Sequence, residues 1–190
     1  MVTLNPLKKR RIGTVGRPLP GVRIDIRNDD GTPVQTGTVG EIWVKGDNVM
    51  VGYFKKSRET NAVLTADGWL KTGDLGKLDG DNYLTIMDRK KDLIIVKGLN
   101  VYPQEIESVI LLHPRVKEAA VVGKPDPKTG EEIIKAYVTL KDKSPLDIAD
   151  IMTLCKTHLA PYKRPKSVSV LEALPKNAFQ KVLKKELRHW

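Results

Sequence analysis

Two short segments of the chain combine residue types that can bind a nucleotide sugar. Asp74 lies in Gly73-Asp74-Leu75, and Arg89 lies in Asp88-Arg89-Lys90-Lys91-Asp92. A carboxylate can accept hydrogen bonds from two neighbouring hydroxyls at once, and a guanidinium donates to oxygen in a fixed fork. A short hairpin joins the two segments. We therefore expect Asp74 and Arg89 to grip a ribose.

The segments that carry these two residues belong to a β-rich first part of the chain. Alternation of apolar and polar residues, together with turn signals, predicts an antiparallel meander of strands over Val22–Arg27, Glu41–Lys45, Trp69–Lys77 and Tyr83–Met87. A short helix from Ser57 to about Leu64 interrupts the meander. Ser57 is the expected N-cap of this helix, because its hydroxyl can accept a hydrogen bond from the first turn.

After Asp88 the pattern changes to mixed strands and helices. The continuous apolar run Leu93–Val96 predicts a strand covered on both faces. Pro103 opens a helix whose buried stripe is Ile106, Val109, Ile110 and Leu112. Strands are expected at Val116–Gly123, Ile133–Leu140 and Ser167–Leu171, and helices at Asp147–Leu159 and Lys181–Leu187. Cys155 lies on the apolar face of the first of these helices, so we expect it to serve packing.

The predicted fold class is α+β, with a small antiparallel β subdomain followed by a compact α+β domain. We divide the chain into an irregular lead-in over residues 1–12, a β-rich subdomain over 13–87 and an α+β domain over 88–190.

Composition and charge narrow the class of protein. No apolar run approaches the roughly 20 residues that span a bilayer, and a single cysteine excludes a disulfide framework and a four-cysteine zinc site. We expect a cytoplasmic protein without a metal site of its own. The formal charge is +10, with basic clusters at Lys8–Arg11 and from Lys176 to Arg188. Lys8–Arg11 has no interleaved aromatic residue, so no nucleic-acid partner is expected, while peripheral membrane contact stays open.

Four segments, taken in order, carry a family resemblance. They span residues 40–54, 67–75, 88–107 and 174–181, and they include Gly40-Glu41-Ile42-Trp43-Val44-Lys45-Gly46 and Leu174-Pro175-Lys176-Asn177-Ala178-Phe179-Gln180-Lys181. Together they resemble the adenylate-forming superfamily of acyl-CoA synthetases, luciferases and peptide-synthetase adenylation domains. Among these enzymes, long-chain fatty-acid–CoA ligases have the most similar residue sequences at three places: Asp88–Asp92, Gly98–Pro103 and Tyr162–Lys166. The resemblance extends from about Gly13 to His189.

The resemblance implies a two-step reaction and a nucleotide site. Family members join ATP and a carboxylate into an acyl-adenylate, and coenzyme A then displaces AMP. By this resemblance Asp74 and Arg89 contact the ribose of ATP, and Ile86 packs near the nucleotide. Lys181 is implied as the catalytic lysine of adenylation, reaching the carboxylate and the α-phosphate.

Further roles follow from the same resemblance. Asp88 is implied as the hinge about which the C-terminal lid rotates between the half-reactions, and Gly98 and Asn100 as residues facing the pantetheine channel. One residue departs from the family pattern: Gln180 stands where a glycine usually precedes the lysine. Glycine suits a loop that needs an unusual φ, so the departure bears on the loop geometry. Lys176 is the nearest competitor of Lys181 for the catalytic role.

Several family segments are not found in this chain. The phosphate-binding loop, the segment that holds adenine and Mg²⁺, and the acyl pocket all belong upstream. We therefore expect the last third of a fatty-acid ligase, inactive alone, whose partner is the missing N-terminal domain and whose Mg²⁺ ligands lie outside the chain. Two alternatives stay open: a fragment of an aryl-CoA ligase or of a peptide-synthetase adenylation domain, and a non-catalytic module that binds a partner protein or an anionic surface.

Overall fold

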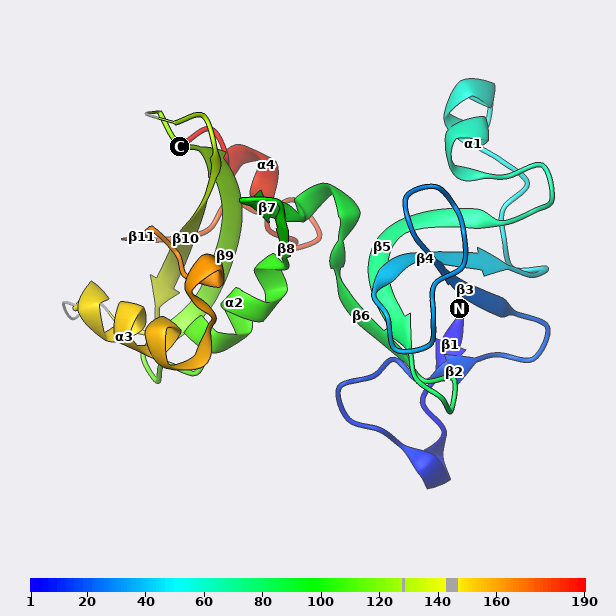
Figure 1. The fold of residues 1–190 in the computed structure, drawn as a ribbon, viewed down its shortest axis with the longest axis horizontal. Coiled ribbons are helices and arrows are strands. Elements are labelled where there is room, and N and C mark those ends of the chain that lie inside the picture. Colours follow the sequence, from blue (N-terminus) through cyan, green and yellow to red (C-terminus); the bar gives the residue numbers. More distant parts are fainter. Residues whose placement is uncertain (128, 143–146) are drawn as a thin grey trace. The chain divides into compact units, whose positions relative to one another are not determined.

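The computed structural model of the protein describes residues 1–127, 129–142 and 147–190 (Figure 1). The chain forms two compact units, Met1–Lys91 and Asp92–Trp190. The first is built mainly from antiparallel strands, and the second combines a sheet with helices, so the predicted α+β fold class is confirmed. None of the helices in the described ranges is long and apolar enough to cross a membrane.

The N-terminal unit is organised around a four-stranded antiparallel sheet. Its strands lie in sequence order: β3 (Arg23–Arg27), β4 (Gly40–Lys45), β5 (Leu70–Leu78) and β6 (Leu84–Arg89). A second, two-stranded sheet pairs β1 (Thr3–Leu4) with β2 (Arg17–Pro18), and the short helix η1 spans Leu7–Lys9. Alternate residues of the large sheet share one face, and there they form a core of Ile26, Ile42, Val44 and Leu84.

Helix α1 (Ser57–Val63) forms where the sequence predicts a helix, but the predicted cap is wrong. Lys56 occupies the N-cap position and its side chain makes no capping hydrogen bond. Ser57 is already inside the helix. The turn before the helix is closed instead by Thr60, whose Oγ1 accepts a hydrogen bond of 2.9 Å from the backbone N–H of Tyr53.

Strand β5 is irregular on both of its edges. Toward β4, Glu41 pairs with Leu75 and Trp43 with Lys71, so that residues 72–74 bulge opposite Ile42. Toward β6 the register shifts next to Leu75, which leaves Met87 without a partner in the ladder. Bulges bend a strand and redirect its side chains. Both irregularities therefore lie beside Asp74 and Arg89.

The C-terminal unit is built on a three-stranded sheet with helices on both faces. Strand β10 (Glu132–Leu140) pairs antiparallel with β9 (Val116–Pro125) and parallel with β11 (Ser167–Val170). Three α-helices cover the sheet: α2 (Pro103–Ile110), α3 (Ile148–His158) and α4 (Lys184–Leu187). The short helix η3 spans Pro161–Lys163, and another short helix, η2 (Lys90–Asp92), lies where the two units meet in the sequence.

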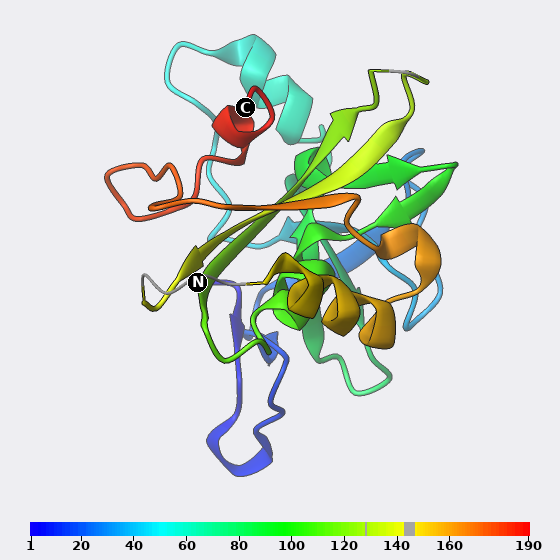
Figure 2. The same cartoon turned by 90° about the vertical axis from the view of Figure 1, so that its left-hand side faces the viewer.

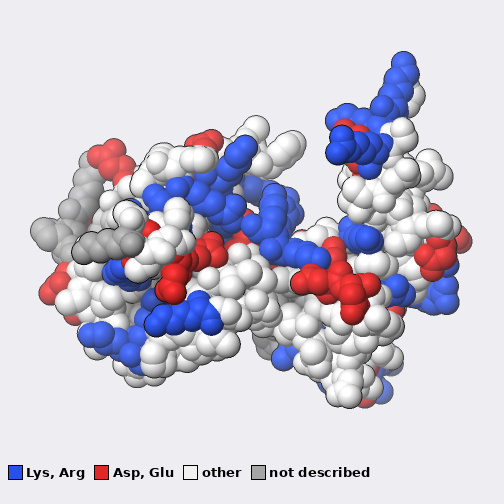
Figure 3. All heavy atoms as spheres, turned by 45° about the horizontal axis from the view of Figure 1, so that its top comes forward, with Lys and Arg blue, Asp and Glu red and all other residues white. Residues whose placement is uncertain are grey.

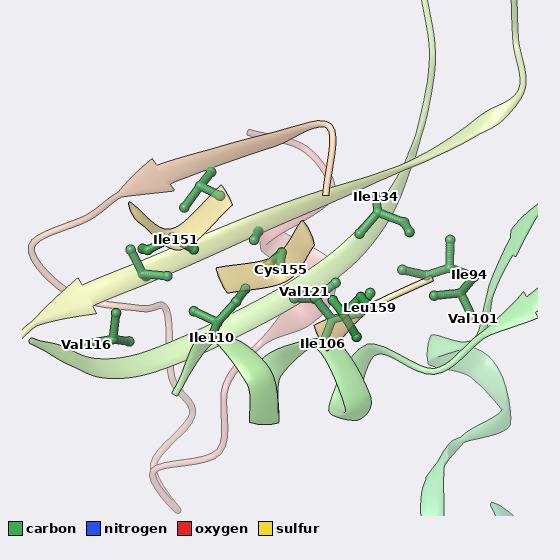
Figure 4. Close-up of a cluster of buried hydrophobic side chains, with 13 residues drawn as sticks. Ile94, Val101, Ile106, Ile110, Val116, Val121, Ile134, Ile151, Cys155 and Leu159 are labelled. Carbon is green, nitrogen blue, oxygen red and sulfur yellow. The ribbon is translucent and has the colours of Figure 1, made fainter. Parts of the chain in front are cut away.

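Neighbouring residues of the central strands point to opposite faces and serve two separate cores. Val121 and Ala136 join the larger core with residues of α2 and α3, including Ile106, Ile110, Ile151 and Cys155 (Figure 4). Val122 and Tyr137 join the smaller core on the other face, with Leu187 of α4. Figure 2 shows α4 (red) and α3 (gold) on opposite sides of the sheet. The cysteine thiol is fully buried among apolar side chains, as expected for a packing residue.

The hairpin of β7 (Ile94–Val96) and β8 (Leu99–Val101) corrects the prediction of a fully covered strand. The two strands pair only with each other, and Ile95 is 53% exposed while Ile94 is buried. Two further expectations are also wrong at element ends. Leu112 lies beyond the end of α2 and is exposed, and α4 begins at Lys184 rather than at Lys181.

Candidate functional site

Asp74 and Arg89 are cross-strand neighbours at the bulged end of β5 and β6. The Nε atom of Arg89 lies 3.5 Å from Oδ1 of Asp74, and the two side chains are 55% and 37% exposed. At this distance the direct bond is weak, so both groups keep hydrogen-bonding capacity for a ligand. The structure thus brings together the two residues that the sequence selects as a ribose grip.

The pair opens on a hollow of about 490 Å³ within the N-terminal unit. Its lining consists of Thr72, Gly73, Asp74, Arg89, Lys90 and Lys91. One carboxylate therefore faces three cationic side chains across a polar space. Such a set can accept from sugar hydroxyls and balance the charge of a phosphate.

The Asp74 turn is held by side chains rather than by the regular ladder. Gly73 takes a positive φ of 71°, which glycine adopts without steric cost. The backbone N–H of Gly73 donates to Oε1 of Glu41 at 3.2 Å, and that of Asp74 donates to Oγ1 of Thr72 at 3.1 Å. The Thr72 hydroxyl in turn donates to the carbonyl of Ile42 at 2.7 Å.

Lys90, next to Arg89, is tied into the same turn. Its Nζ lies 3.0 Å from Oε2 of Glu41 and 2.8 Å from Oδ1 of Asp29. The hydrogen bonds to Asp29 and to Glu41 raise the pKa of Lys90 against the opposing effect of burial. The ammonium is therefore charged throughout the neutral range.

Sequence reasoning missed this role of Glu41 and Lys90. The sequence offers only a partial signal, because Glu41 is an acidic residue directly before the apolar run Ile42-Trp43-Val44. The structure shows that Glu41 is only 8% exposed. A buried carboxylate needs partners. The other residue of the network, Lys90, lies in a run of charges where nothing in the pattern distinguishes it.

The remaining predicted residues of the N-terminal unit lie on β6. Ile86 is partly exposed and pairs with Gly76. Asp88 is buried, pairs with Leu75, and accepts the backbone N–H of Arg89 at 2.7 Å through Oδ1. Asp88 therefore belongs to the strand, shortly before the division between the two units.

Lys181 lies in the C-terminal unit, at the end of a tight turn organised by Asn177. Oδ1 of Asn177 accepts the backbone N–H groups of Phe179 and Lys181, each at 3.0 Å. The N–H of Gln180 closes the turn on the Asn177 carbonyl at 3.0 Å. Gln180 has a φ of 62°, the left-handed conformation that favours glycine.

The two candidate lysines of this segment differ in their partners. Nζ of Lys176 pairs with the carboxylate of Glu118, and both side chains are largely covered. The side chain of Lys181 is exposed, and within the described ranges no carboxylate pairs with its ammonium. Of the two lysines, Lys181 is thus the one whose ammonium is open to solvent.

Gly98 and Asn100 belong to the β7–β8 hairpin of the C-terminal unit. Lys97 and Gly98 form its two-residue turn with φ values of 50° and 78°, as a type I′ turn requires. Asn100 follows on β8 and is exposed. Across the described part of the chain, no group of three or more His, Cys, Asp or Glu side chains could hold a metal ion. The residues described here therefore do not fit a Mg²⁺ site.

Comparison with known proteins identifies the protein family. Residues 1–54 match the AMP-binding enzyme family, and residues 105–181 match the AMP-binding enzyme C-terminal domain. The chain belongs to the adenylate-forming, AMP-binding enzyme family and corresponds to its C-terminal part.

Individual relatives agree with this assignment. A long-chain-fatty-acid–CoA ligase of Yersinia pestis is 45% identical over 99% of this chain and 33% of its own length. ATP-bound MatB from Rhodopseudomonas palustris superposes with a TM-score of 0.92 at 40% identity, over 100% of this chain and 38% of that one. The Bacillus subtilis o-succinylbenzoate CoA synthetase, in complex with its acyl-adenylate intermediate, gives a TM-score of 0.86 at 43% identity over 94% and 36%. The chain thus spans about a third of these proteins.

Proposed function

We propose that the chain is the C-terminal part of an AMP-forming fatty-acyl-CoA ligase. The observation that carries the proposal is the Asp74–Arg89 pair, which faces an open polar hollow beside two further lysines. A relative at 45% identity bears the name of a long-chain fatty-acid ligase. In this proposal ATP, coenzyme A and a fatty acid are the substrates.

The first half-reaction activates a carboxylate. A carboxylate oxygen attacks the α-phosphorus of ATP, the bond to the bridging oxygen breaks, and pyrophosphate leaves. Asp74 accepts hydrogen bonds from the ribose hydroxyls and Arg89 donates to the same sugar, which fixes the nucleotide. Lys181 neutralises the negative charge shared by the entering carboxylate and the α-phosphate. Stabilising this charge in the transition state is the main way in which a protein accelerates phosphoryl-group chemistry. The described residues contain no set of side chains that could hold Mg²⁺, so we derive no step through the metal.

In the second half-reaction the thiol sulfur of coenzyme A attacks the acyl carbonyl, the bond to AMP breaks, and the thiol proton is lost to solvent. The exposed hairpin of Gly98 and Asn100 is proposed to line the path of the pantetheine arm. Asp88 is proposed as the hinge between the half-reactions. Its support is its place near the end of β6, shortly before the division between the units after Lys91.

The identity of the carboxylic acid substrate is a more specific part of the proposal. Fatty acid is favoured by the Yersinia pestis relative, whereas the similarity to o-succinylbenzoate CoA synthetase keeps an aromatic acid as the second candidate. Because the chain spans about a third of these relatives, we further propose that it is inactive without an upstream domain. Catalysis of fatty-acid-dependent ATP–pyrophosphate exchange by the 190-residue chain would contradict that part.

The role of Lys181 can be tested in a chimera that joins this chain to the first two thirds of the Yersinia pestis ligase. We expect Lys181→Ala to slow acyl-adenylate formation by about 10²- to 10³-fold, as removal of a charge-stabilising donor does in other enzymes. Thioester formation from supplied acyl-adenylate should stay within about twofold. ATP–pyrophosphate exchange and acyl-CoA formation measure the two steps separately.

Lys185→Ala is the matched control, since Lys185 is also exposed and lies in the same basic segment. It should leave both half-reactions unchanged. An equal loss of both half-reactions in Lys181→Ala, or the same selective loss in Lys176→Ala, would contradict the assignment.

A non-catalytic role of the basic chain ends receives less support. Arg11 pairs with Asp79 and Asp81, and three basic side chains of the C-terminal segment also have carboxylate partners: Lys176, Lys184 and Arg188. Figure 3 shows basic side chains in several groups, with acidic groups between them. Several basic side chains of the C-terminal cluster and Arg11 of the N-terminal cluster are therefore used in contacts within their own unit.

A further inference from the structure

We propose that Glu41 is a positioning residue of the nucleotide site. Its buried carboxylate fixes the Asp74 turn relative to the strand end that carries Arg89. The inference rests on the function proposed above, because it concerns how the same ribose grip is held in shape.

The bulge removes the Asp74 turn from the regular hydrogen bonds of the strand ladder, so other contacts must stabilise the turn. Residues 72–74 lie opposite Ile42 alone, so the N–H of Gly73 has no regular partner on β4. Oε1 of Glu41 accepts that N–H at 3.2 Å. A partly buried N–H without an acceptor would destabilise the folded chain. The turn therefore adopts the conformation in which the Glu41 carboxylate accepts the Gly73 N–H.

The second oxygen of the same carboxylate holds the other half of the grip. Oε2 of Glu41 lies 3.0 Å from Nζ of Lys90, and Lys90 directly follows Arg89 at the end of β6. One rigid planar group therefore joins the backbone before Asp74 to the side chain after Arg89. The two functional residues themselves are 3.5 Å apart and largely exposed, and such a pair contributes little to its own geometry.

The position of Glu41 also separates it from the ligand. A second hollow of about 410 Å³ shares Thr72, Gly73 and Lys90 with the ribose hollow, and its lining includes Glu41. Glu41 does not line the ribose hollow itself. In this proposal Glu41 therefore acts through Gly73 and Lys90 and not on the nucleotide. Its role is positioning rather than catalysis.

The test measures how well the chain distinguishes a ribose from a deoxyribose. The ¹⁵N-labelled 190-residue chain is titrated with AMP and with 2′-deoxyAMP, and the amide signals of Gly73 and Asp74 report binding. We expect the wild type to prefer AMP by about tenfold, the usual effect of one hydrogen bond to a charged group. Glu41→Gln should reduce this preference below about threefold, because its amide turns a donor toward the Lys90 ammonium.

A second pair of variants keeps the test independent of folding. Lys90→Met removes only the ammonium arm from a partly exposed site and should also lower the preference, and Lys90→Arg should restore it. Asp25→Asn is the matched control, because Asp25 is a partly covered carboxylate of the same sheet that bonds Arg27 instead of the turn. This control should keep the full preference, and the amide spectra of all variants should show a folded N-terminal unit.

The outcomes separate the two proposals. A lowered preference in Glu41→Gln and Lys90→Met, with rescue by Lys90→Arg, supports the positioning role. A full preference in folded Glu41→Gln overturns that role and leaves the nucleotide site in place. A wild type that shows no preference, or a preference that survives Asp74→Asn, overturns the proposed nucleotide site and the positioning role with it.

Discussion

Gln180 adopts a left-handed backbone conformation that residues with a side chain rarely favour. Its φ is 62°, and it stands next to Lys181 in a turn closed by three hydrogen bonds to Asn177. The family resemblance places glycine there, and the structure gives the physical reason. The substitution does not open the turn, because the side chain and carbonyl of Asn177 hold it on both sides.

We predict that Gln180→Gly stabilises the C-terminal unit. A left-handed conformation costs a non-glycine residue about 1–2 kcal/mol, and part of this gain is lost to the greater freedom of glycine in the unfolded chain. The free energy of unfolding should therefore rise by about 1 kcal/mol. Urea denaturation followed through the amide signals of β9 and β10 measures it.

Gln35→Gly serves as the comparison, since Gln35 is an exposed loop residue without a positive φ. There the same change should leave stability unchanged or lower it slightly. If both substitutions had the same effect, relief of backbone strain at Gln180 would not be the cause.

At the scale of elements, helix α2 packs against the sheet of the C-terminal unit in the same core as the hairpin of β7 and β8. Ile106 and Ile110 are fully buried in the larger core, together with Ile94 and Val101 of the hairpin (Figure 4). Oε1 of Glu107 on the same helix accepts the backbone N–H of Val121 at 2.8 Å. The helix is thus fixed to the sheet both by apolar packing and by a polar contact with β9.

We predict that Ile110→Ala destabilises the C-terminal unit by about 2–5 kcal/mol, the usual cost of emptying a fully buried isoleucine site. Leu111→Ala at the next position removes a similar volume from a residue that is 47% exposed, and it should cost well under 1 kcal/mol. Chemical denaturation of both variants measures the difference. Equal losses would contradict the observed packing.

The sequence predicts these elements where local pattern and packing agree. Alternation at Val22–Arg27 and the proline at position 103 identify β3 and α2, because each reflects one repeated environment. The run Leu93–Val96 misleads, since four apolar residues look alike in a covered strand and in a hairpin with one exposed face. The cap at Ser57 fails because Thr60 closes the preceding turn.

The residues of the candidate site could be predicted from the sequence, but the contacts that hold them could not. The register of the turn between β5 and β6 would by itself place Asp74 opposite Asp88, and the unpaired Met87 shifts the partner to Arg89. Both residues nevertheless belong to the same end of one hairpin, so their nearness could be predicted from the sequence. The hold of Glu41 on Gly73 and Lys90 could not, since it depends on a bulge that leaves no mark in the sequence. Contacts between distant strands at irregular positions require the structure.

At the scale of the whole molecule, the chain consists of two units with separate cores. The core of Met1–Lys91 and the two cores of Asp92–Trp190 share no residue. Each unit thus has the apolar contacts that cooperative folding needs. The second unit also holds its own first and last segments together, through the ion pair of Asp92 and Arg188 at 2.9 Å.

We therefore predict that residues 92–190 fold without the first unit. Their amide spectrum should overlay with the corresponding signals of the whole chain, apart from residues near the new terminus. Heteronuclear NMR of both proteins checks this, with Ile110→Ala in the shortened chain as a destabilised control. A collapsed, poorly dispersed spectrum of the unmutated segment would show that the units depend on each other.

The burial of Cys155 has a practical consequence for following the two units in solution. It is the single cysteine of the sequence, it lies in the larger core, and burial raises the pKa of its thiol. Thiolates, not thiols, react with maleimides and spin labels. A cysteine introduced at an exposed position of either unit would thus be labelled first, without removal of the native one. Fluorescence or electron-spin distance measurements between one label in each unit can then test the proposed hinge at Asp88.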